Sequence, residues 1–461
     1  MIPLLDRRQW LAQAGGGVGM LALADLLRAD GVIEQPRPHF AATAKSVIWL
    51  FMEGGPSAMD TFDPKPELER GHGRQPQQAI DVFFGNPGPL MKSPFSFQQH
   101  GQSGTWACEH LPHLARHVDD LALIKAVHAE SPNHSPALFQ MNTGLTRPGF
   151  PSAGSWIQYG LGTENQNLPG FVVMQNNRGT KGGPLNWSSG FLPASFQGTP
   201  FRTTGSPLLD LDRPPGLSVG QQRRMIDLAA RFNEQHRSEH ADQSDLAARI
   251  RSYELAFEMQ SEAKEAVDLT TETEATLSAY GLDRKQTEGF GKKCLLARRL
   301  VERGVRFVQV YSDGEWDAHG NLARNHRENC QATDQPIAAL LGDLKQRGLL
   351  DSTLVIWGGE FGRMPVSQQG GGRDHNPHGF LMWMAGGGIR GGVHHGETDE
   401  LGYKAAVDPA SVHDIHATIL HLLGIDHKRL TYTHNGRRYR LTDVAGDVIT
   451  PIIARADDAG V

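Results

Sequence analysis

The sequence predicts a doubly wound α/β fold, in which a mainly parallel sheet carries helices on both faces. Short, continuous apolar runs are typical of buried parallel strands, and segments with helical spacing of apolar residues alternate with them along the chain. The chain is also 461 residues long, with 39% hydrophobic and 21% charged residues. This length and composition suit a large globular core.

Apolar runs place the strands. Residues 46–52 (SVIWLFM) form a β-rich run that stops at a Glu-Gly-Gly-Pro turn, as expected for a buried parallel strand. Five further runs predict strands at 121–127, 170–174, 305–311, 353–357 and 380–385. Helical patterns lie between them at about 111–117, 135–142, 292–302, 326–345 and 412–423.

These elements are assigned to one domain that spans residues 43–455. Within it, a segment at about 219–278 is rich in Glu, Gln, Arg and Ala and poor in Gly and Pro, which predicts a helical insertion. The stretches at about 64–102 and 176–215 have the composition of loops and are expected to cover the sheet.

Residues 1–42 are interpreted as an export signal and a linker. Arg7 and Arg8 precede Trp10 and a Gly/Ala/Leu run, a pattern that resembles a twin-arginine signal. The run is too short and too rich in glycine for a stable membrane span, so a periplasmic or secreted protein is expected. The alternative is an ordinary amphipathic first helix with two basic residues.

Charge and cysteine content exclude other classes of protein. The formal net charge is -6 and the sequence has no basic stripe, which excludes nucleic acid as a partner. Three scattered cysteines, Cys108, Cys294 and Cys330, cannot form a disulfide framework. They are predicted to be small buried hydrophobic residues, with a single disulfide left open. The sequence does not indicate an oligomeric state.

Acidic and histidine residues follow three of the predicted strands. Glu53 comes after the first strand, Asp317 and His319 after the strand at 305–311, and Glu360 after the strand at 353–357. In doubly wound sheets, ligands bind beyond the carboxyl ends of the strands. These side chains are therefore expected to meet in one polar site.

Each of these groups also has a simpler interpretation. Asp317 and His319 lie two residues apart in a glycine-flanked loop, where they can point a carboxylate and an imidazole at one cation or merely satisfy a turn. Glu360 follows two glycines, and a buried carboxylate there must be paired or coordinated. It is predicted to be a metal ligand or an outer acid, unless Arg363 holds it in a structural salt bridge.

The densest polar cluster contains Arg373, Asp374, His375 and His378, and it follows three consecutive glycines. Neutral imidazole is a common ligand of transition metals, and carboxylates complete such sites. One of the two histidines is predicted to be a ligand, and the other a proton donor or a supporting residue. Three more histidines lie on a predicted helix and are left out of the site, namely His413, His416 and His421.

The segment VHAESPNHSP lies between the strand at 121–127 and a predicted helix. Backbone N–H groups at a helix N-terminus bind anions, so the oxyanion of an ester could sit beside Ser131, Asn133 and His134. The hydroxyl of Ser131 could attack that ester. The alternative is that Ser131 or Asn133 only caps the helix.

Long motifs in order along the chain resemble a known family. These are RRQWL, FMEGGPSAMDTFDPKP, WDAHGN, DQPIAALLGDLKQRGLLDSTLVIWGGEFGR, GRDHNPHGFLMWMAGGGIRGG and DIHATILHLLGID. Together they are similar to a bacterial sulfatase-like family of unknown function that is exported by twin-arginine signals. That family belongs to the alkaline phosphatase-like superfamily.

The resemblance implies a hydrolase fold in which carboxylates and histidines hold one or two divalent cations beside a nucleophile. Glu53 matches the metal carboxylate after the first strand, and Asp317 with His319 matches an Asp and a nearby His. An Asp-His pair is matched only in part by Glu360 and Phe361, and a final His by His375 or His378. Because Phe361 cannot coordinate a metal, a single cation is the more economical expectation.

The resemblance does not settle the nucleophile. SPNHSP is similar to the Thr-x-Pro-Asn-His segment of phosphodiesterase-type members, but the nucleophile position falls on Glu130, one residue before Ser131. The Cys-x-Pro-x-Arg or Ser-x-Pro-x-Arg string of formylglycine sulfatases does not occur in the sequence. Ser57, in the turn after the first strand, is a second candidate nucleophile and substrate-binding residue.

The function expected from the sequence is an exported, metal-dependent hydrolase of phosphate or sulfate esters. Asp317, His319 and His378 are the expected primary ligands of a zinc, manganese, calcium or magnesium ion, with Glu53, Glu360 and Asp374 as further ligands. Ser131 and His375 are the expected nucleophile and general acid. Arg363 and Arg373 are expected to bind a small or polysaccharide anionic ester, with Ser57, Asn133 and His134 as further contacts. The alternative is a non-catalytic exported binding protein that keeps the fold.

Overall fold

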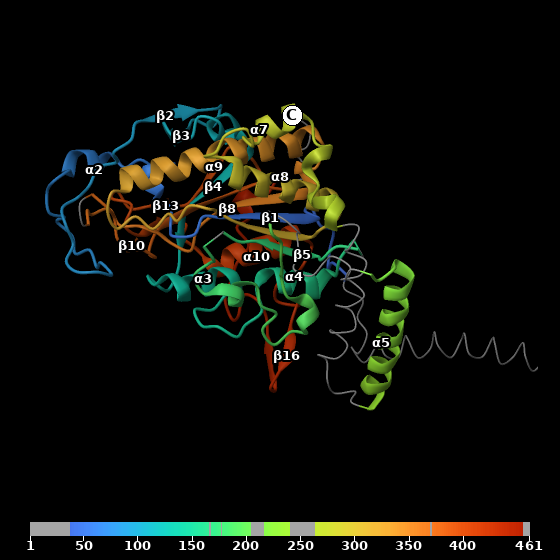
Figure 1. Ribbon diagram of the computed structural model, residues 1–461. Coiled ribbons are helices and arrows are strands. Elements are labelled where there is room, and N and C mark those ends of the chain that lie inside the picture. Colours follow the sequence, from blue (N-terminus) through green and yellow to red (C-terminus); the bar gives the residue numbers. More distant parts are fainter. Residues whose placement is uncertain are drawn as a thin grey trace, which may run out of the picture. The chain divides into compact units, whose positions relative to one another are not determined.

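The computed structural model describes residues 37–165, 167–176, 178–203, 216–239, 263–368 and 371–454. The helices and strands of the described residues lie in the unit that spans Pro38–Val461. They form a mostly parallel sheet with helices on both faces (Figure 1). The predicted fold class is therefore confirmed. Of the predicted export signal and linker at 1–42, residues 1–36 lie outside the described residues.

Nine strands of the described chain form the main sheet, in the order β12-β4-β11-β8-β1-β7-β5-β6, with β15 paired to β4. Pairing is parallel except on both sides of β11, which runs antiparallel to β4 and to β8. The strands are β1 (Ser46–Phe51), β4 (Leu121–His128), β5 (Phe171–Met174), β6 (Thr199–Pro200), β7 (Phe307–Tyr311), β8 (Thr353–Gly358), β11 (Phe380–Ala385), β12 (Val393–His395) and β15 (Ala410–Ser411).

Two layers of helices cover the sheet, one on each face. Alternate side chains of β1 pack against the two layers. Ile48 and Leu50 pack with the helices of one layer, whereas Val47, Trp49 and Phe51 pack with those of the other. Each fully buried apolar side chain contributes about 1.5–3 kcal/mol. The first layer contains η2 (Leu114–Asp120), α8 (Glu288–Glu302) and α9 (Leu322–Gln346), and the second α3 (His134–Thr143), α4 (Ala153–Leu161) and α10 (Val412–Leu422).

Smaller elements surround the sheet. Four two-stranded ribbons are β2 (Phe97–His100) with β3 (Thr105–Cys108), β9 (Gly362–Arg363) with β10 (His375–Asn376), β13 (Glu397–Thr398) with β14 (Ala405–Val407), and β16 (Tyr432–His434) with β17 (Arg437–Tyr439). The remaining helices are η1 (Ala58–Asp60), α2 (Pro66–Gly71), η3 (Gly183–Trp187), η4 (Ala194–Phe196), α5 (Val219–Glu239), η5 (Leu269–Thr271), α7 (Glu274–Ala279), η6 (Leu350–Ser352) and η7 (Thr450–Ile452).

The six predicted strands and most predicted helices are present with boundaries shifted by a few residues. The pattern at 111–117 forms a 3-10 helix that begins three residues later, and the loop predicted at 64–102 contains α2 and β2. The predicted insertion at 219–278 includes α5 and α7, while its residues 240–262 lie outside the described chain. The three cysteines are buried and their thiols are free. Among the described helices, none has the length and apolarity needed to span a bilayer.

The direction of the strands determines where the connecting loops meet. Because β5, β7, β1 and β8 are parallel neighbours, the loops that follow them leave the same edge of the sheet. β11 runs the opposite way, so the segment that precedes it also lies at that edge, and so does the loop after β4. The whole connection between β8 and β11 therefore lies at this edge, together with the loops after β1, β4, β5 and β7.

A buried histidine in the second helix layer makes stability depend on pH. His416 on α10 is fully buried, its Nε2 donates a hydrogen bond to the carbonyl of Met141 at 2.9 Å, and it packs edge-on against Trp49. Burial lowers the pKa of His416 from 6.5 to about 3. The folded protein therefore holds this imidazole neutral, whereas the unfolded chain takes up a proton below pH 6.5.

We expect His416 to stabilise the fold fully above pH 6.5, and this contribution to be lost as the pH falls toward 3. The slope is about 1.4 kcal/mol per pH unit. The variant His416→Gln keeps a donor for Met141 but does not titrate. Its free energy of unfolding, measured with denaturant between pH 6.5 and 4, should fall less steeply with pH by that amount. Equal slopes in both proteins would contradict the prediction.

Candidate active site

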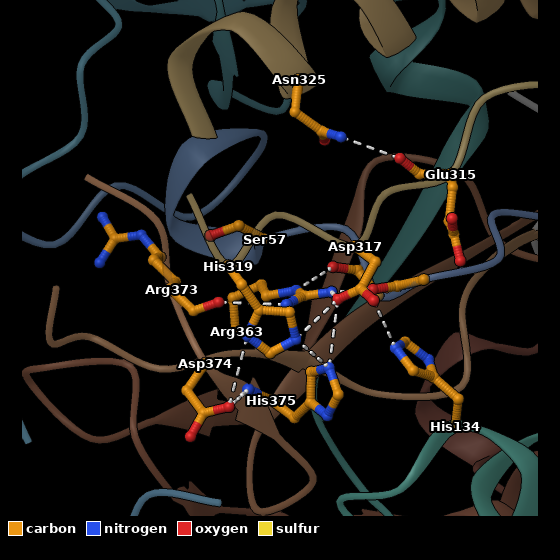
Figure 2. Close-up of polar contacts among 12 residues, drawn as sticks. Ser57, His134, Glu315, Asp317, His319, Asn325, Arg363, Arg373, Asp374 and His375 are labelled. Atoms are coloured by element: carbon orange, nitrogen blue, oxygen red, sulfur yellow. Dashed lines mark hydrogen bonds and ion pairs between the residues drawn. The ribbon is translucent and has the colours of Figure 1, made fainter. Parts of the chain in front are cut away.

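A cluster of imidazoles and carboxylates occupies the carboxyl edge of the sheet. Figure 2 shows the rings of His134, His319 and His375 pointing toward the carboxylate of Asp317. His134 begins α3 after β4, Asp317 and His319 follow β7, and His375 precedes β11. Of these segments, the loop after β7 is the one that the strand-end rule placed at this edge.

Asp317 is the centre of the cluster. Its Oδ1 lies 2.8 Å from Arg363 Nη2, 3.0 Å from His319 Nε2 and 3.2 Å from His375 Nε2. Its Oδ2 lies 3.0 Å from His134 Nε2 and 3.3 Å from Lys181 Nζ. Burial by itself would raise the pKa of Asp317, but the three histidines and Arg363 outweigh it and hold that pKa far below its usual range.

The Nδ1 atom of each histidine is bound to an oxygen. His134 Nδ1 lies 2.6 Å from Glu360 Oε1, His319 Nδ1 lies 2.7 Å from Gln368 Oε1, and His375 Nδ1 lies 2.6 Å from the carbonyl of Pro132. These oxygens only accept hydrogen bonds, so each Nδ1 carries a proton. In the neutral imidazoles, all three Nε2 lone pairs are then directed at Asp317.

Lone pairs that face one another need a positive charge between them. His319 Nε2 and His375 Nε2 are 2.9 Å apart, and both face the same carboxylate oxygen. His134 Nε2 is buried and lacks a partner of hydrogen-bonding geometry, although Asp317 Oδ2 is 3.0 Å away. Either protons on the imidazoles or a bound cation would satisfy this arrangement.

Two sets of side chains in the described chain have the spacing of metal ligands. One contains His134, Asp317 and His375, and the other His319, Asp374 and His375. Metal-bound histidines usually donate their second N–H to a carboxylate or a carbonyl, which fixes the ring and its tautomer. The bonds to Glu360 and Pro132 have this form, so the residues present fit a divalent metal.

Without a bound cation, the pKa values of the three histidines shift in different directions. Burial lowers the pKa of His134, but the nearby carboxylates of Asp317 and Glu360 outweigh that effect and raise it. Hydrogen bonding to Asp317 raises the pKa of His319, whereas burial lowers the pKa of His375. In the absence of metal, protonation is therefore favoured at His134 and His319 over His375.

Two buried glutamates lie behind the cluster. Glu360 accepts the backbone N–H of Gly54 with both oxygens, at 3.0 and 3.1 Å, in addition to His134 Nδ1. Glu53 accepts the backbone N–H of Lys181 at 2.7 Å, and burial raises its pKa to about 7. Glu360 thus supports His134 rather than pairing with Arg363, which was the alternative expected from the sequence.

Arg363 and Arg373 are placed differently from the substrate-binding role expected for them. The buried guanidinium of Arg363 donates to the carbonyls of Gly54, Gly55 and Arg373 as well as to Asp317. The side chain of Arg373 points away from the cluster and forms a buried ion pair with Asp60 (Figure 2). Both guanidiniums donate their hydrogen bonds to groups inside the protein, so their role is to position neighbouring segments.

Ser57 belongs to the same buried layer as Arg373. Its hydroxyl donates to Asp60 Oδ2, and its backbone N–H donates to His326 Nε2 at 3.0 Å. It has no exposed surface, which does not suit direct contact with a substrate. Phe361, at the position matched in part to a metal ligand, is buried with its ring centroid 4.5 Å from His375 and 4.9 Å from His134. It forms an apolar floor for the two imidazoles.

The remaining expected residues lie around the cluster. Ser131 is partly exposed, and its hydroxyl accepts the backbone N–H of the exposed Asn133 at 3.1 Å. The intervening Pro132 is bonded to His375, which brings this loop against the site. His378 is exposed, and its ring packs near Tyr403 at 5.5 Å instead of joining the other imidazoles. His378 thus lies apart from the two groups with the spacing of metal ligands, both of which contain His375.

Sequence reasoning missed two polar contributors. Lys181 lies in a stretch assigned to loop, yet its Nζ contacts both Asp317 and Glu315. Gln368 orients His319 from the segment before the glycine run. Neither residue lies directly after a strand, so the strand-end rule could not find them. The available signal was a lysine among the three glycines of the segment 179–183.

Close backbone packing brings the loops together. Gly54 has a φ of 109°, and a Cβ on it would lie 2.5 Å from the backbone nitrogen of Asp317. A Cβ on Gly372 would overlap the carbonyl of His319. These glycines allow the loops after β1 and before β11 to press against the loop after β7.

These features define a doubly wound α/β protein with a histidine and carboxylate cluster at the carboxyl edge of its sheet. The chain belongs to the family described as Protein of unknown function (DUF1501), which it matches over residues 44–453. No curated protein matches the sequence.

Solved structures with similar backbones come from several organisms. A sulfatase from Pseudoalteromonas sp. (PsFucS1) shares 12% identity at a TM-score of 0.36, covering 89% of this chain and 71% of its own. The lipoteichoic acid synthase LtaP from Listeria monocytogenes shares 8% at 0.40, covering 89% and 77%. The alkaline phosphatase from the Antarctic bacterium TAB5 shares 12% at 0.34, covering 83% and 98%.

The close packing at Gly54 predicts that a larger residue there destabilises the protein. In Gly54→Ala, the added methyl group meets the backbone of Trp316 and Asp317 in a left-handed conformation, so the loops must separate. We expect a loss of stability on the order of 3 kcal/mol or more, measured by denaturant unfolding. Gly73→Ala is the matched control, because Gly73 has a φ of 79° but open space around it, and it should lose only about 1–2 kcal/mol. Equal losses would show that the contact with Asp317 is unimportant.

Proposed function

We propose that the protein is a metal-dependent hydrolase of phosphate or sulfate esters. The observation that carries the proposal is the convergence of three imidazole Nε2 atoms on Asp317, with each Nδ1 committed to an oxygen. A purely structural cluster would not require so many partly or fully buried polar groups, because each one is costly to desolvate. The resemblance of the sequence motifs to sulfatase-like proteins supports the same chemistry.

The metal would be held by His134, Asp317 and His375, with His319 and Asp374 beside them. A divalent cation supplies Lewis-acid polarisation of the ester oxygen and lowers the pKa of a bound water or hydroxyl. Glu360 orients His134, and the carbonyl of Pro132 orients His375. Arg363 holds the Asp317 carboxylate in place.

Lys181 takes the substrate-binding role that the arginines cannot fill. Its side chain is one-third exposed, and Nζ lies 3.3 Å from Asp317 Oδ2 at the rim of the cluster. An ammonium group there attracts the anionic oxygens of a phosphate or sulfate ester and stays outside the buried hydrogen bonds. Hydrogen bonding and pairing with Glu315 and Asp317 outweigh burial and raise the pKa of Lys181, which keeps it charged.

Ser131 is the proposed nucleophile. Its hydroxyl is partly exposed on a loop that leads into α3, and the neighbouring Pro132 is tied to His375. Attack by Ser131 Oγ on the phosphorus or sulfur would break the bond to the alcohol and leave an esterified serine for hydrolysis by water. Ser131 gives up one proton in this step, and the leaving alkoxide gains one.

A non-catalytic binding protein is the second candidate. The observation that favours it is the pairing of Asp317 with Arg363 and Lys181, two cations that already offset its charge. In that case the cluster would bind an anion through Lys181 and would need no metal. The two candidates differ in their response to chelator.

The ligand assignment predicts which variants lose metal. His134→Ala, His375→Ala and Asp317→Asn should each weaken binding of a divalent ion on the order of 100-fold, because the first two remove a proposed ligand and the third removes the negative charge of one. His421→Ala, on α10 and outside the cluster, is the control and should keep the ion. Metal content by mass spectrometry and affinity by chelator competition are the measurements. Equal retention in all four variants would sink the assignment.

Turnover tests the reaction itself. Aryl phosphate, phosphodiester and aryl sulfate should be offered to purified protein with and without chelator, and we expect hydrolysis that chelator abolishes and added cation restores. Ser131→Ala should reduce kcat by roughly 100-fold or more, whereas Ser135→Ala on α3 should not. If the protein binds no metal and cleaves none of the esters with any cation, the hydrolase proposal fails.

Export by the twin-arginine route is part of the proposal, and it rests on Arg7, Arg8 and the apolar run that follows them. We expect residues 1–42 to direct a folded reporter out of the cytoplasm, and Arg7→Lys with Arg8→Lys to retain it there. Cell fractionation measures the outcome. Export of the double variant at the normal level would contradict this route.

A further inference from the structure

A loop after α2 reaches over the candidate site. Its base is closed by two backbone hydrogen bonds, from Gly73 to Leu90 at 2.9 Å and from Leu90 to Arg74 at 2.8 Å. Leu90 also forms a bridge with Val366, in the strand-like segment that leads to the glycine run. The loop is thus anchored beside the site rather than free to swing away.

Two adjacent phenylalanines lie on this loop next to the imidazoles. The ring of Phe83 stacks on His375, with centroids 5.8 Å apart and planes 19° apart. The ring of Phe84 meets His319 edge-on at 5.4 Å. Their centroids are 4.4 Å apart and their planes 69° apart, so the two rings form an aromatic corner.

Asp374 links the aromatic corner to the site. One of its oxygens accepts the backbone N–H of Phe84 at 2.8 Å, and the other accepts the backbone N–H of His375 at 2.9 Å. A buried carboxylate with both oxygens occupied in this way fixes the distance between the loop and the imidazole. The rings are therefore built into the same framework as the cluster.

The aromatic corner remains open on its outer side. Phe83 is 39% exposed and Phe84 is 50% exposed, although both are large apolar side chains. If the rings served only to shield the imidazoles, burying them under the chain would be more favourable. Aromatic faces beside a polar site are instead suited to stacking against a ring of a bound ligand.

We propose that Phe83 and Phe84 bind a six-membered ring on the alcohol side of the ester, while the anionic group lies at the cluster. This inference rests on the proposed function and adds the class of alcohol. An ester whose ring lies one bond from the ester oxygen can touch both surfaces, because the rings contact His319 and His375 directly. Short acyclic esters would lack this contact.

Non-hydrolysable anions separate ring binding from turnover. Binding of phenylphosphonate and methylphosphonate to the full chain should be measured by calorimetry with a saturating divalent cation, and benzenesulfonate and methanesulfonate should be measured in the same way. We expect the phenyl compound of the preferred pair to bind about fivefold to tenfold more tightly than the methyl compound. In Phe83→Ala/Phe84→Ala, the preference should fall to about one.

Phe40→Ala is the matched control. Phe40 is also 39% exposed and also packs against an imidazole, that of His421 at 5.0 Å, but it lies outside the site. This variant should keep the full preference, and a cooperative thermal transition should show that the double variant is folded. A preference that survives in the double variant, or equal affinities in the unmodified protein, overturns the ring-binding role and leaves the hydrolase proposal standing. If none of the four anions binds, both proposals fail.

Discussion

The ion pair between Asp317 and the buried Arg363 is the constraint on which the candidate site depends. The carboxylate belongs to the loop after β7, and the guanidinium, which comes from β9, also binds backbone carbonyls of the loop after β1 and of the segment before β11. One side chain thereby joins three loops. The guanidinium is costly to bury, and removal of Asp317 would take away its carboxylate partner in the interior, so the loops are held together as a unit.

The strand directions of the sheet determine which segments of the chain lie next to the Asp317–Arg363 pair. Parallel neighbours send their following loops to one edge, and the reversed strand β11 sends its preceding segment there as well. His375 therefore reaches the cluster from before a strand, whereas Asp317 reaches it from after one. The glycines at 54 and 372 remove the Cβ atoms that would keep these segments apart. Around the edge, Glu360, Gln368 and Pro132 then fix the orientation of each ring.

The sequence predicted the residues whose position follows from strand direction. Glu53, Asp317, His319 and Glu360 were found because each comes soon after a buried apolar run, and that is a local pattern. The arginines were given the wrong partners, because their bonds to Asp60 and to backbone carbonyls join segments hundreds of residues apart. Lys181, Gln368 and the two phenylalanines lie in loops whose paths depend on tertiary packing, so no periodic signal marked them.

The ion pair between Arg373 and Asp60 joins residues 313 positions apart, and the bond between Arg363 and Asp317 joins two further segments. A ribosome must therefore have made more than three-quarters of the chain before the pocket can close. Until then, His134 has no common geometry with Asp317 and His375. Assembly of the cluster is consequently a late event in folding, because it depends on contacts between segments far apart in the sequence.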